Sequence, residues 1–368
     1  MTVSLNGTSG IVFNDASTQN TAATGFGFKS RIINGAMVID QRNAGASVAF
    51  ASGVNTYALD RWYIDNATDG AFTIEQVEDA PAGLYQSAKL TVTTADASIG
   101  ATQDAVIQQR IEGLNVTDLN FGTASASTVT LSFWVKSSLT GSFGGSLMNS
   151  AYTRAYPFGF TISAANTWEQ KTVTIAGDTS GTWLYTNGVG MRVSFSMAAG
   201  SSYSGTANAW ASTLLFQPTG STNVIGTNGA TFYITGVQLE KGSTATSFDY
   251  RPYGTELALC QRYAYVISGN TQPIGAGYNR STTIAYVYGS LPVAMRIAPS
   301  LTSSNSTGYF ALEYGTSGSA LGATIALYQA STTGYSVNIS PATTITAASG
   351  CYLYTNNAST SVVFSAEL

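Results

Sequence analysis

Short runs of alternating apolar and polar residues recur along this chain, separated by clusters of Gly, Ser, Asn and Asp. Every second side chain is apolar in residues 129–136, 172–175 and 191–197. Successive side chains of a strand point to opposite faces of a sheet, so these runs predict strands with one face on a core. Repeated short strands with turn residues between them are typical of a β-sandwich. We therefore predict an all-β fold.

The length of the chain predicts more than one folded unit. It has 368 residues, whereas a single hydrophobic core commonly supports about 250 to 300 residues. Only 9% of the residues are charged, but 44% are hydrophobic and 11% are aromatic. This apolar content is enough to offset the entropy lost on folding, so most of the chain is expected to fold.

Residues 251–268 divide two sets of strand patterns. The turn signal Arg251-Pro252-Tyr253-Gly254 follows the last strand of the first set. Thr255 then suits the cap of a short helix with Glu256 in its first turn. Beyond this segment the strand patterns return, with Tyr in place of many aliphatic residues. The segment therefore predicts a linker and one short helix.

The boundary sequence from residue 236 to 263, GVQLEKGSTATSFDYRPYGTELALCQRY, resembles the domain junction of bacteriophage virion proteins of the tail-fibre and minor structural type. Further segments are similar to the same family: residues 33–43, 57–62, 292–302 and 10–23, with Ala16 where that family commonly has Gly. The strand order, with long connections and a final strand at 231–239, resembles the double-sheet jelly roll of carbohydrate-binding modules.

The organisation expected from these patterns has four parts. They are a short extended N-terminal arm (1–30), a jelly-roll β-sandwich (31–250), the linker and short helix (251–268) and a smaller C-terminal β-sandwich (269–368). The arm has one strand-like run, Ile11, Val12 and Phe13. A lone short strand is stable only against another sheet, so this run is predicted to attach the chain to another virion protein. A frayed terminus is the alternative.

Composition excludes several functions. A net charge of −4 argues against nucleic-acid binding, which needs clustered Lys and Arg. The chain has no signal-peptide pattern and no apolar run of about 18 residues, so we expect neither export nor membrane insertion. Without His, catalytic triads that use it and His-ligated metals are excluded. Carboxylate pairs for glycoside cleavage remain, at spacings that also arise by chance. We expect no enzyme.

Aromatic residues beside polar loops are the candidate ligand-binding residues. Planar rings stack on sugar rings while nearby Asn, Asp and Gln bind hydroxyl groups. Trp183, Tyr185, Tyr203 and Trp210 lie in or beside polar, Gly-rich stretches that suit this role, with core packing or a subunit interface as the alternative. The 21 Tyr residues, many in the last third of the chain, suit an adhesive surface or a subunit interface equally.

Metal and disulfide signals are few, and no cofactor is expected apart from a structural calcium ion. The jelly-roll resemblance implies such an ion, for which Asp60, Asp65, Asp69 and Asp249 are candidate ligands and solvated turn residues the alternative interpretation. Cys260 and Cys351 are the only two Cys residues and lack metal-ligand spacing. Buried free thiols are favoured over a disulfide between them.

The resemblance to virion proteins implies the function and its setting. The leading hypothesis is a tail fibre or tail-associated adhesin that binds a host surface glycan. A capsid decoration protein or head fibre is the first alternative, and a polysaccharide depolymerase is the second. The resemblance also implies a homotrimer in the virion, assembled in the host cytoplasm, although the chain carries no coiled-coil heptads that would set the number of chains.

Overall fold

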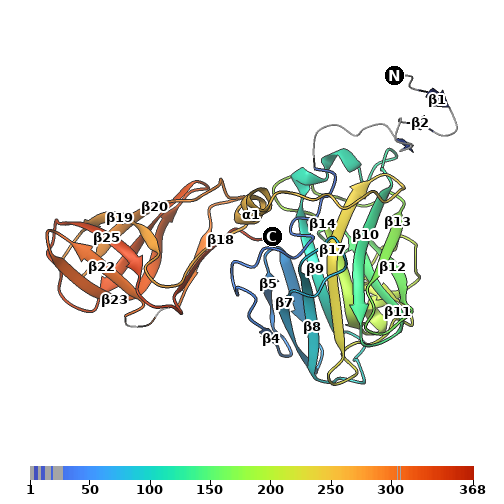
Figure 1. Cartoon of the computed structure of the whole chain (residues 1–368), viewed down its shortest axis with the longest axis horizontal. Helices are drawn as coiled ribbons and strands as arrows, with labels where there is room; N and C mark the ends of the chain where they lie inside the picture. Colours follow the sequence, from blue (N-terminus) through green and yellow to red (C-terminus); the bar gives the residue numbers. More distant parts are fainter. Residues whose placement is uncertain (1–3, 7–9, 13–17, 20–27, 305, 307) are drawn as a thin grey trace.

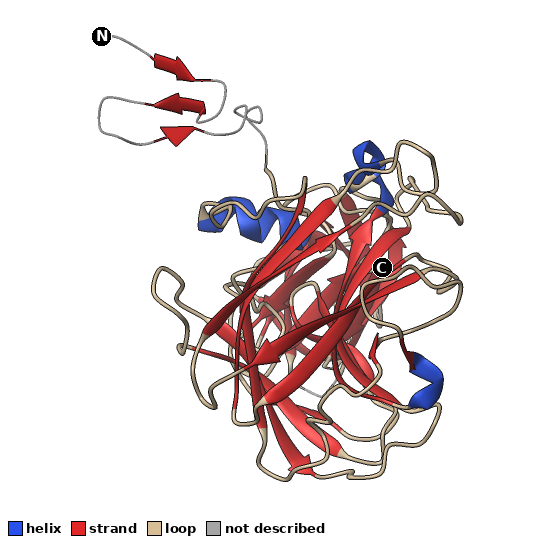
Figure 2. Cartoon of the chain, turned by 90° about the vertical axis from the view of Figure 1, so that its right-hand side faces the viewer, coloured by secondary structure: helices blue, strands red, loops and turns tan. Residues whose placement is uncertain are grey.

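The computed structural model describes residues 4–6, 10–12, 18–19, 28–304, 306 and 308–368. In this part of the chain, strands and turns predominate, with one α-helix and three short 3-10 helices at the edges of the strand-built body (Figure 2). Two β units lie on either side of the helix α1 (Tyr253–Gln261) (Figure 1). The predicted all-β fold with one short helix at the junction is confirmed. None of the described helices is long and apolar enough to cross a membrane.

The larger unit is built from two six-stranded antiparallel sheets. Sheet I has the order β13 (Glu169–Ile175), β10 (Val129–Ser137), β17 (Thr231–Lys241), β8 (Ser87–Thr94), β7 (Ala71–Val77) and β4 (Val48–Phe50). Sheet II has the order β12 (Ala155–Ile162), β11 (Gly141–Met148), β14 (Val189–Ala199), β9 (Asp104–Glu112), β6 (Trp62–Asn66) and β5 (Asn55–Leu59). Neighbours in each sheet are mostly distant in sequence, as in a jelly roll.

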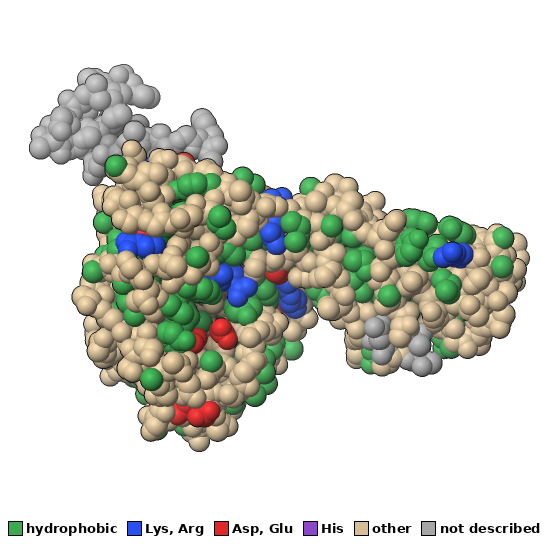
Figure 3. Space-filling model, turned by 180° about the vertical axis from the view of Figure 1, so that it is seen from behind, with side chains coloured by type: hydrophobic (Ala, Val, Ile, Leu, Met, Phe, Trp, Pro, Cys, Tyr) green, Lys and Arg blue, Asp and Glu red, His purple; other side chains and the backbone are tan. Residues whose placement is uncertain are grey.

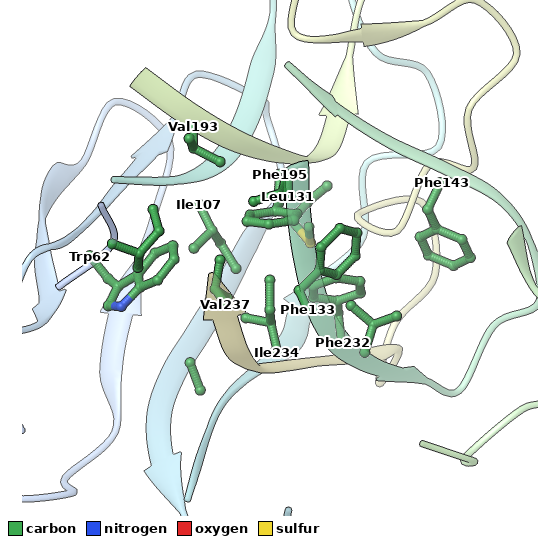
Figure 4. Packing of buried hydrophobic residues seen from close by; sticks show 14 of the residues in the cluster. Trp62, Ile107, Leu131, Phe133, Phe143, Val193, Phe195, Phe232, Ile234 and Val237 are labelled. Atoms are coloured by element: carbon green, nitrogen blue, oxygen red, sulfur yellow. The ribbon is translucent and has the colours of Figure 1, made fainter. Parts of the chain in front are cut away.

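Apolar side chains of the two sheets interdigitate to form the core of this unit (Figure 4). On β10, every second residue from Val129 to Val135 packs in this core, as the alternation predicts, while Thr130 and Ser132 are buried outside the core cluster. The ring of Phe133 meets those of Phe160 and Phe195 edge to face, each at a centroid distance of 5.0 Å. Phe133 therefore joins sheet I to two strands of sheet II, β12 and β14.

Replacing Phe133 by Ala is expected to lower the free energy of unfolding by about 3–5 kcal/mol, because a buried aromatic ring is lost and a cavity remains. Denaturation followed by Trp fluorescence reports on this unit, since all five Trp residues lie between positions 62 and 210. Thr172→Ala, at an exposed position on β13, is the matched control and should change stability by less than about 0.5 kcal/mol. Equal effects of the two substitutions would contradict the packing described.

The smaller unit contains a closed six-stranded antiparallel barrel. Its order is β19 (Pro273–Asn279), β20 (Ala285–Ser290), β24 (Gly334–Pro341), β23 (Gly318–Ala330), β22 (Phe310–Tyr314) and β25 (Gly350–Thr355), which pairs back with β19. A three-stranded sheet of β18 (Ala264–Ser268), β26 (Ser361–Ser365) and β21 (Ser300–Ser303) packs on the same core. The β-sandwich expected here is thus, in detail, a barrel with an added sheet. Closure removes the free edges of the six barrel strands.

Strands β1 (Ser4–Asn6), β2 (Gly10–Val12) and β3 (Thr18–Gln19) form a small antiparallel sheet in the N-terminal arm. The sequence indicated one extended strand, but the structure pairs that strand on both sides within the arm. Ile11 and Val12 lie in the central strand, β2, whereas Phe13 lies outside the described residues. Attachment of the arm to another virion protein stays a prediction.

Helix α1 differs from its prediction at its start. It begins at Tyr253, and the cap position is Pro252, without a side-chain cap, so Thr255 is not the cap. Glu256 lies in the first turn, as predicted, and its carboxylate accepts hydrogen bonds from the backbone N–H of Asn34 and from Arg251. Cys260 in α1 and Cys351 in β25 are free and buried, in line with the favoured interpretation.

Two carboxylates join the larger unit to the smaller one. Glu112, at the end of β9, is almost fully buried and accepts hydrogen bonds from Arg262 Nη2 (2.7 Å), Arg262 Nε (3.0 Å) and Tyr263 Oη (2.7 Å). Glu367, just after β26, forms ion pairs with Arg42 (3.0 Å) and Arg61. Charged groups from both units therefore satisfy each other across the junction.

Candidate functional site

The outward face of sheet II holds a cluster of charged and aromatic side chains. On β14, alternate residues from Met191 to Met197 pack in the core, so Arg192, Ser194 and Ser196 face away from it. Seen from behind, the larger unit shows basic and acidic side chains close together near its middle (Figure 3). This face is the candidate site, because the opposite face of the same strands is filled by the core.

Four side chains form a line across this face, here named the Arg–Tyr row. It contains Tyr63 of β6, Arg110 of β9, Arg192 of β14 and Tyr152 of the β11–β12 loop. Arg110 lies directly opposite Arg192 in the strand register. The Cζ atom of Arg110 lies 3.7 Å from the ring centroid of Tyr63, and that of Arg192 lies 4.4 Å from the ring centroid of Tyr152. Each guanidinium is therefore attracted to an aromatic face on one side.

The two Arg side chains of the row keep unused donors. Arg110 Nη1 donates to the main-chain oxygen of Leu368, the last residue of the sequence, and Arg192 Nη1 donates to Gln108 Oε1 at 3.3 Å. The Nε atoms of both are buried without a partner, and no Asp or Glu side chain of the described residues forms an ion pair with either. Burial lowers the pKa of Arg192, and the charge of Arg110 acts in the same direction. Like charges opposed on a sheet repel, so the row favours an anionic ligand.

The connection between β14 and β17 covers the neighbouring part of the same face. Leu215 and Phe216 of this connection pack against a patch of outward residues of sheet II, Val106, Met148 and Ala155. The cover buries the hydroxyl groups of Ser194 and Ser196, which have no hydrogen-bond partner. Tyr63 and Arg110, which lie on the β6–β9 side, stay half-exposed. The row is therefore accessible from that side.

One carboxyl group, that of Asp65 on β6, adjoins the row, and a second, that of Asp104 on β9, interacts electrostatically with Asp65. Asp104, at the start of β9, is only 7% exposed, and its Oδ2 is buried without a partner. Burial, followed by the charge of Asp65, raises the pKa of Asp104 to about 7. Burial also raises the pKa of the half-buried Asp65, against the opposing effect of the Arg110 charge. The two carboxyl groups are thus electrostatically coupled and titrate above their usual range.

The structure does not bring the four calcium candidates together. Asp60 is buried, its pKa is raised by burial to about 6, and it accepts hydrogen bonds from the backbone and side chain of Gln41. Asp69 is exposed, and Asp249 accepts hydrogen bonds from the backbone of residues 29 and 30. Only Asp65 lies beside the row. The described residues contain no group of three or more Asp, Glu or Cys that suits a metal ion.

Three of the four aromatic candidates lie together, but they enclose one another. The ring of Trp183 is 6% exposed and meets the rings of Phe121 and Trp210 edge to face, at 4.9 and 5.7 Å. Tyr185 donates its hydroxyl to the Phe121 carbonyl. This geometry favours the packing alternative for Trp183, because neither face of its ring is free.

The fourth candidate, Tyr203, lies elsewhere, against Phe216 in the cover over sheet II, at 5.5 Å and edge to face. Ligand binding by Tyr185, Tyr203 and Trp210, which are half-buried, stays a prediction. The sequence analysis missed the Arg–Tyr row. One sign of the row was present in the sequence: Arg192 stands at an outward position of the strand pattern in residues 191–197. Its pairing with Arg110 could not be predicted, because it depends on the register between two strands that are distant in sequence.

No known protein family and no curated protein matches the sequence. Solved structures with some likeness include a domain of the bacteriophage CBA120 tailspike protein 4, at 13% identity and a TM-score of 0.30, over 58% of this chain and 21% of that one. A second example is a xylan-binding domain from Paenibacillus barcinonensis, at 12% identity and a TM-score of 0.25, over 55% of this chain and 99% of that one. A third is a family 11 carbohydrate-binding module from Clostridium thermocellum, at 11% identity and a TM-score of 0.28, over 55% of this chain and 100% of that one. This chain spans about a fifth of the tailspike chain. Likenesses of this size carry no argument about function.

Replacing Asp104 by Asn is expected to stabilise the larger unit above pH 7 and to have little effect near pH 4. The folded state holds the proton of Asp104 up to about pH 7, whereas an unfolded Asp loses it near 3.8. Asp104 therefore lowers the stability of the wild-type protein as the pH rises through this window, on the order of 2–4 kcal/mol, and the variant lacks this contribution. Denaturation followed by Trp fluorescence at both pH values measures this difference. A similar change in Glu78→Gln, at an exposed carboxylate, would contradict it.

Proposed function

We propose that this protein is a tail fibre or tail-associated adhesin of a phage virion, and that its Arg–Tyr row binds an acidic saccharide of the host surface. The observation that carries the binding role is the pair Arg110 and Arg192, opposed in register without an Asp or Glu partner. A guanidinium binds a carboxylate or phosphate through parallel N–H···O bonds, and it does so best where water is partly excluded. Support for the virion role comes from the sequence resemblance of residues 236–263.

The aromatic members of the row suit the rest of such a ligand. Tyr63 is half-exposed on the open side of the face, and Tyr57 meets it edge to face at 5.2 Å. A sugar ring that places its anionic group on Arg110 would pack its C–H groups on these rings. The charged group then supplies orientation, and the rings supply contact area at small entropic cost.

A polysaccharide depolymerase is the weaker alternative. Asp65 and Asp104 are coupled carboxyl groups with raised pKa values, and glycoside cleavage uses a pair of carboxyl groups. The Oδ2 atom of Asp104 is buried, however, and a general acid must reach the glycosidic oxygen. Binding without cleavage is therefore the function we propose.

Arg110→Gln and Arg192→Gln are each expected to weaken retention of an acidic polysaccharide by about tenfold or more, since each removes one charged partner of the anion. Alginate, a polymer of uronic acids, immobilised on a sensor surface is the probe, at 50 and 500 mM NaCl. Wild-type retention should fall at the higher salt concentration, because salt screens charge pairs. Lys241→Gln, at an exposed charge of the same unit, is the control. Equal retention of all four proteins, checked for folding by Trp fluorescence, would overturn the site.

Antibody labelling of the native virion separates the adhesin from a capsid protein. An antibody against residues 255–368, viewed by electron microscopy, is expected to label the tail. Label over the head would favour the decoration protein or head fibre, and it would remove the adhesin assignment even if the Arg–Tyr row binds saccharide.

A further inference from the structure

A shallow groove of about 490 Å³ lies on the outside of the barrel. Its lining includes Tyr288 of β20, Ser336 of β24 and Gln329 of β23. In the strand register, Ser336 lies opposite Tyr288 on one side and opposite Gln329 on the other. The three side chains therefore form a row across three adjacent strands, with Ser336 in the middle.

The side chain of Ser336 forms the floor of this groove, and its hydroxyl group has no hydrogen-bond partner. The neighbouring residues Tyr335 and Val337 pack in the barrel core, so Ser336 faces outward. It is nevertheless only 3% exposed, and its Oγ atom is buried and unpartnered. Leaving a buried hydroxyl group without a partner destabilises the folded chain, and a ligand that bonds to it would remove this cost.

The walls of the groove offer an aromatic face and an amide. Tyr288 is 50% exposed, and Gln329 is also exposed. Residues 264–368 contain only four charged side chains, Arg280, Arg296, Glu313 and Glu367, and none of them lines the groove. The ligand that fits is therefore neutral, with a flat apolar face and several hydroxyl groups.

We propose that this groove binds one pyranose ring of a neutral saccharide, with the ring packed on Tyr288 and hydroxyl groups bonded to Ser336 Oγ and the Gln329 amide. Neighbouring strands lie about 4.8 Å apart, so the row spans about 10 Å, wide enough for one sugar ring. Two other exposed Tyr residues, Tyr328 on β23 and Tyr278 on the adjoining strand β19, would extend the surface for a longer chain. Figure 3 shows hydrophobic side chains, a class that includes Tyr there, gathered on the barrel.

A second copy of this chain is the other occupant that such a surface admits. The centre of a subunit interface is usually apolar and well packed, and a stable one buries about 800 Å² on each partner. The centre of this groove is instead a hydroxyl group flanked by an amide. The saccharide is therefore the better fit. The inference uses residues separate from the Arg–Tyr row and does not depend on it.

Saturation-transfer difference NMR with the full chain tests the proposal. The probes are the methyl glycosides of glucose, galactose and mannose. At least one is expected to receive saturation, with Kd about tenfold weaker in Tyr288→Ala and weaker also in Ser336→Ala. Tyr85→Ala, at a similarly exposed Tyr of the larger unit, and Arg110→Gln are controls that should bind as the wild type does.

Two kinds of result would overturn the proposal. One is found by NMR: absence of transfer to all three glycosides, or equal transfer in wild type and Tyr288→Ala. The other is found by sedimentation: a wild-type oligomer that Tyr288→Ala converts to monomers, without sugar binding, would make the groove an interface between copies. Loss of alginate retention in Arg110→Gln with intact glycoside binding would leave this proposal standing, so the failures of the two sites are distinguishable.

Discussion

The packing of Phe133 against Phe160 and Phe195 fixes which side chains of the larger unit face its core and which face outward. Strand side chains alternate strictly, so committing one set to the core commits the other set to the outside. On β14 this places Arg192 on the outward face, opposite Arg110. A slip of β14 by one residue would turn Arg192 into the core and away from Arg110. The site therefore depends on the core that lies behind it.

The Arg–Tyr row is also tied to the smaller unit. Arg110 Nη1 and Tyr57 Oη both donate to the main-chain oxygen of Leu368, the last residue, the latter at 3.0 Å, while Arg61 donates to the carbonyl oxygen of Arg110. Arg61 in turn pairs with Glu367, which follows the last strand of the smaller unit. The position of Arg110 therefore depends on contacts from both units. An anion that bound to the row would compete with, or add to, the hydrogen bond to Leu368.

Sequence alone predicted what alternation and turn residues encode locally. The buried positions of β10, the all-β fold and the short helix near residue 255 all follow from patterns within about ten residues. Closure of the barrel does not follow from local patterns, because it depends on the pairing of β19 with β25, which are distant in sequence. Without that pairing the same strands could form a second sandwich. Trp183 stands in a polar, Gly-rich stretch, yet Phe121 and Trp210 from other segments enclose it. Local polarity left an exposed ring and core packing open for Trp183, and its burial favours packing.

The two proposed sites lie on units that the junction holds together, and this bears on how an adhesin would work. Single sugar sites bind weakly, because a small ligand offers few contacts to offset the entropy lost on binding. When two sites are linked, the second binding step occurs at the effective concentration that the linkage sets. Here Glu112 bonds to Arg262 and Tyr263 across the junction, so the linkage is a packed contact and not a free tether. A host surface that presents acidic and neutral sugars together would then be retained more strongly than either sugar alone, provided their spacing matches that of the two units.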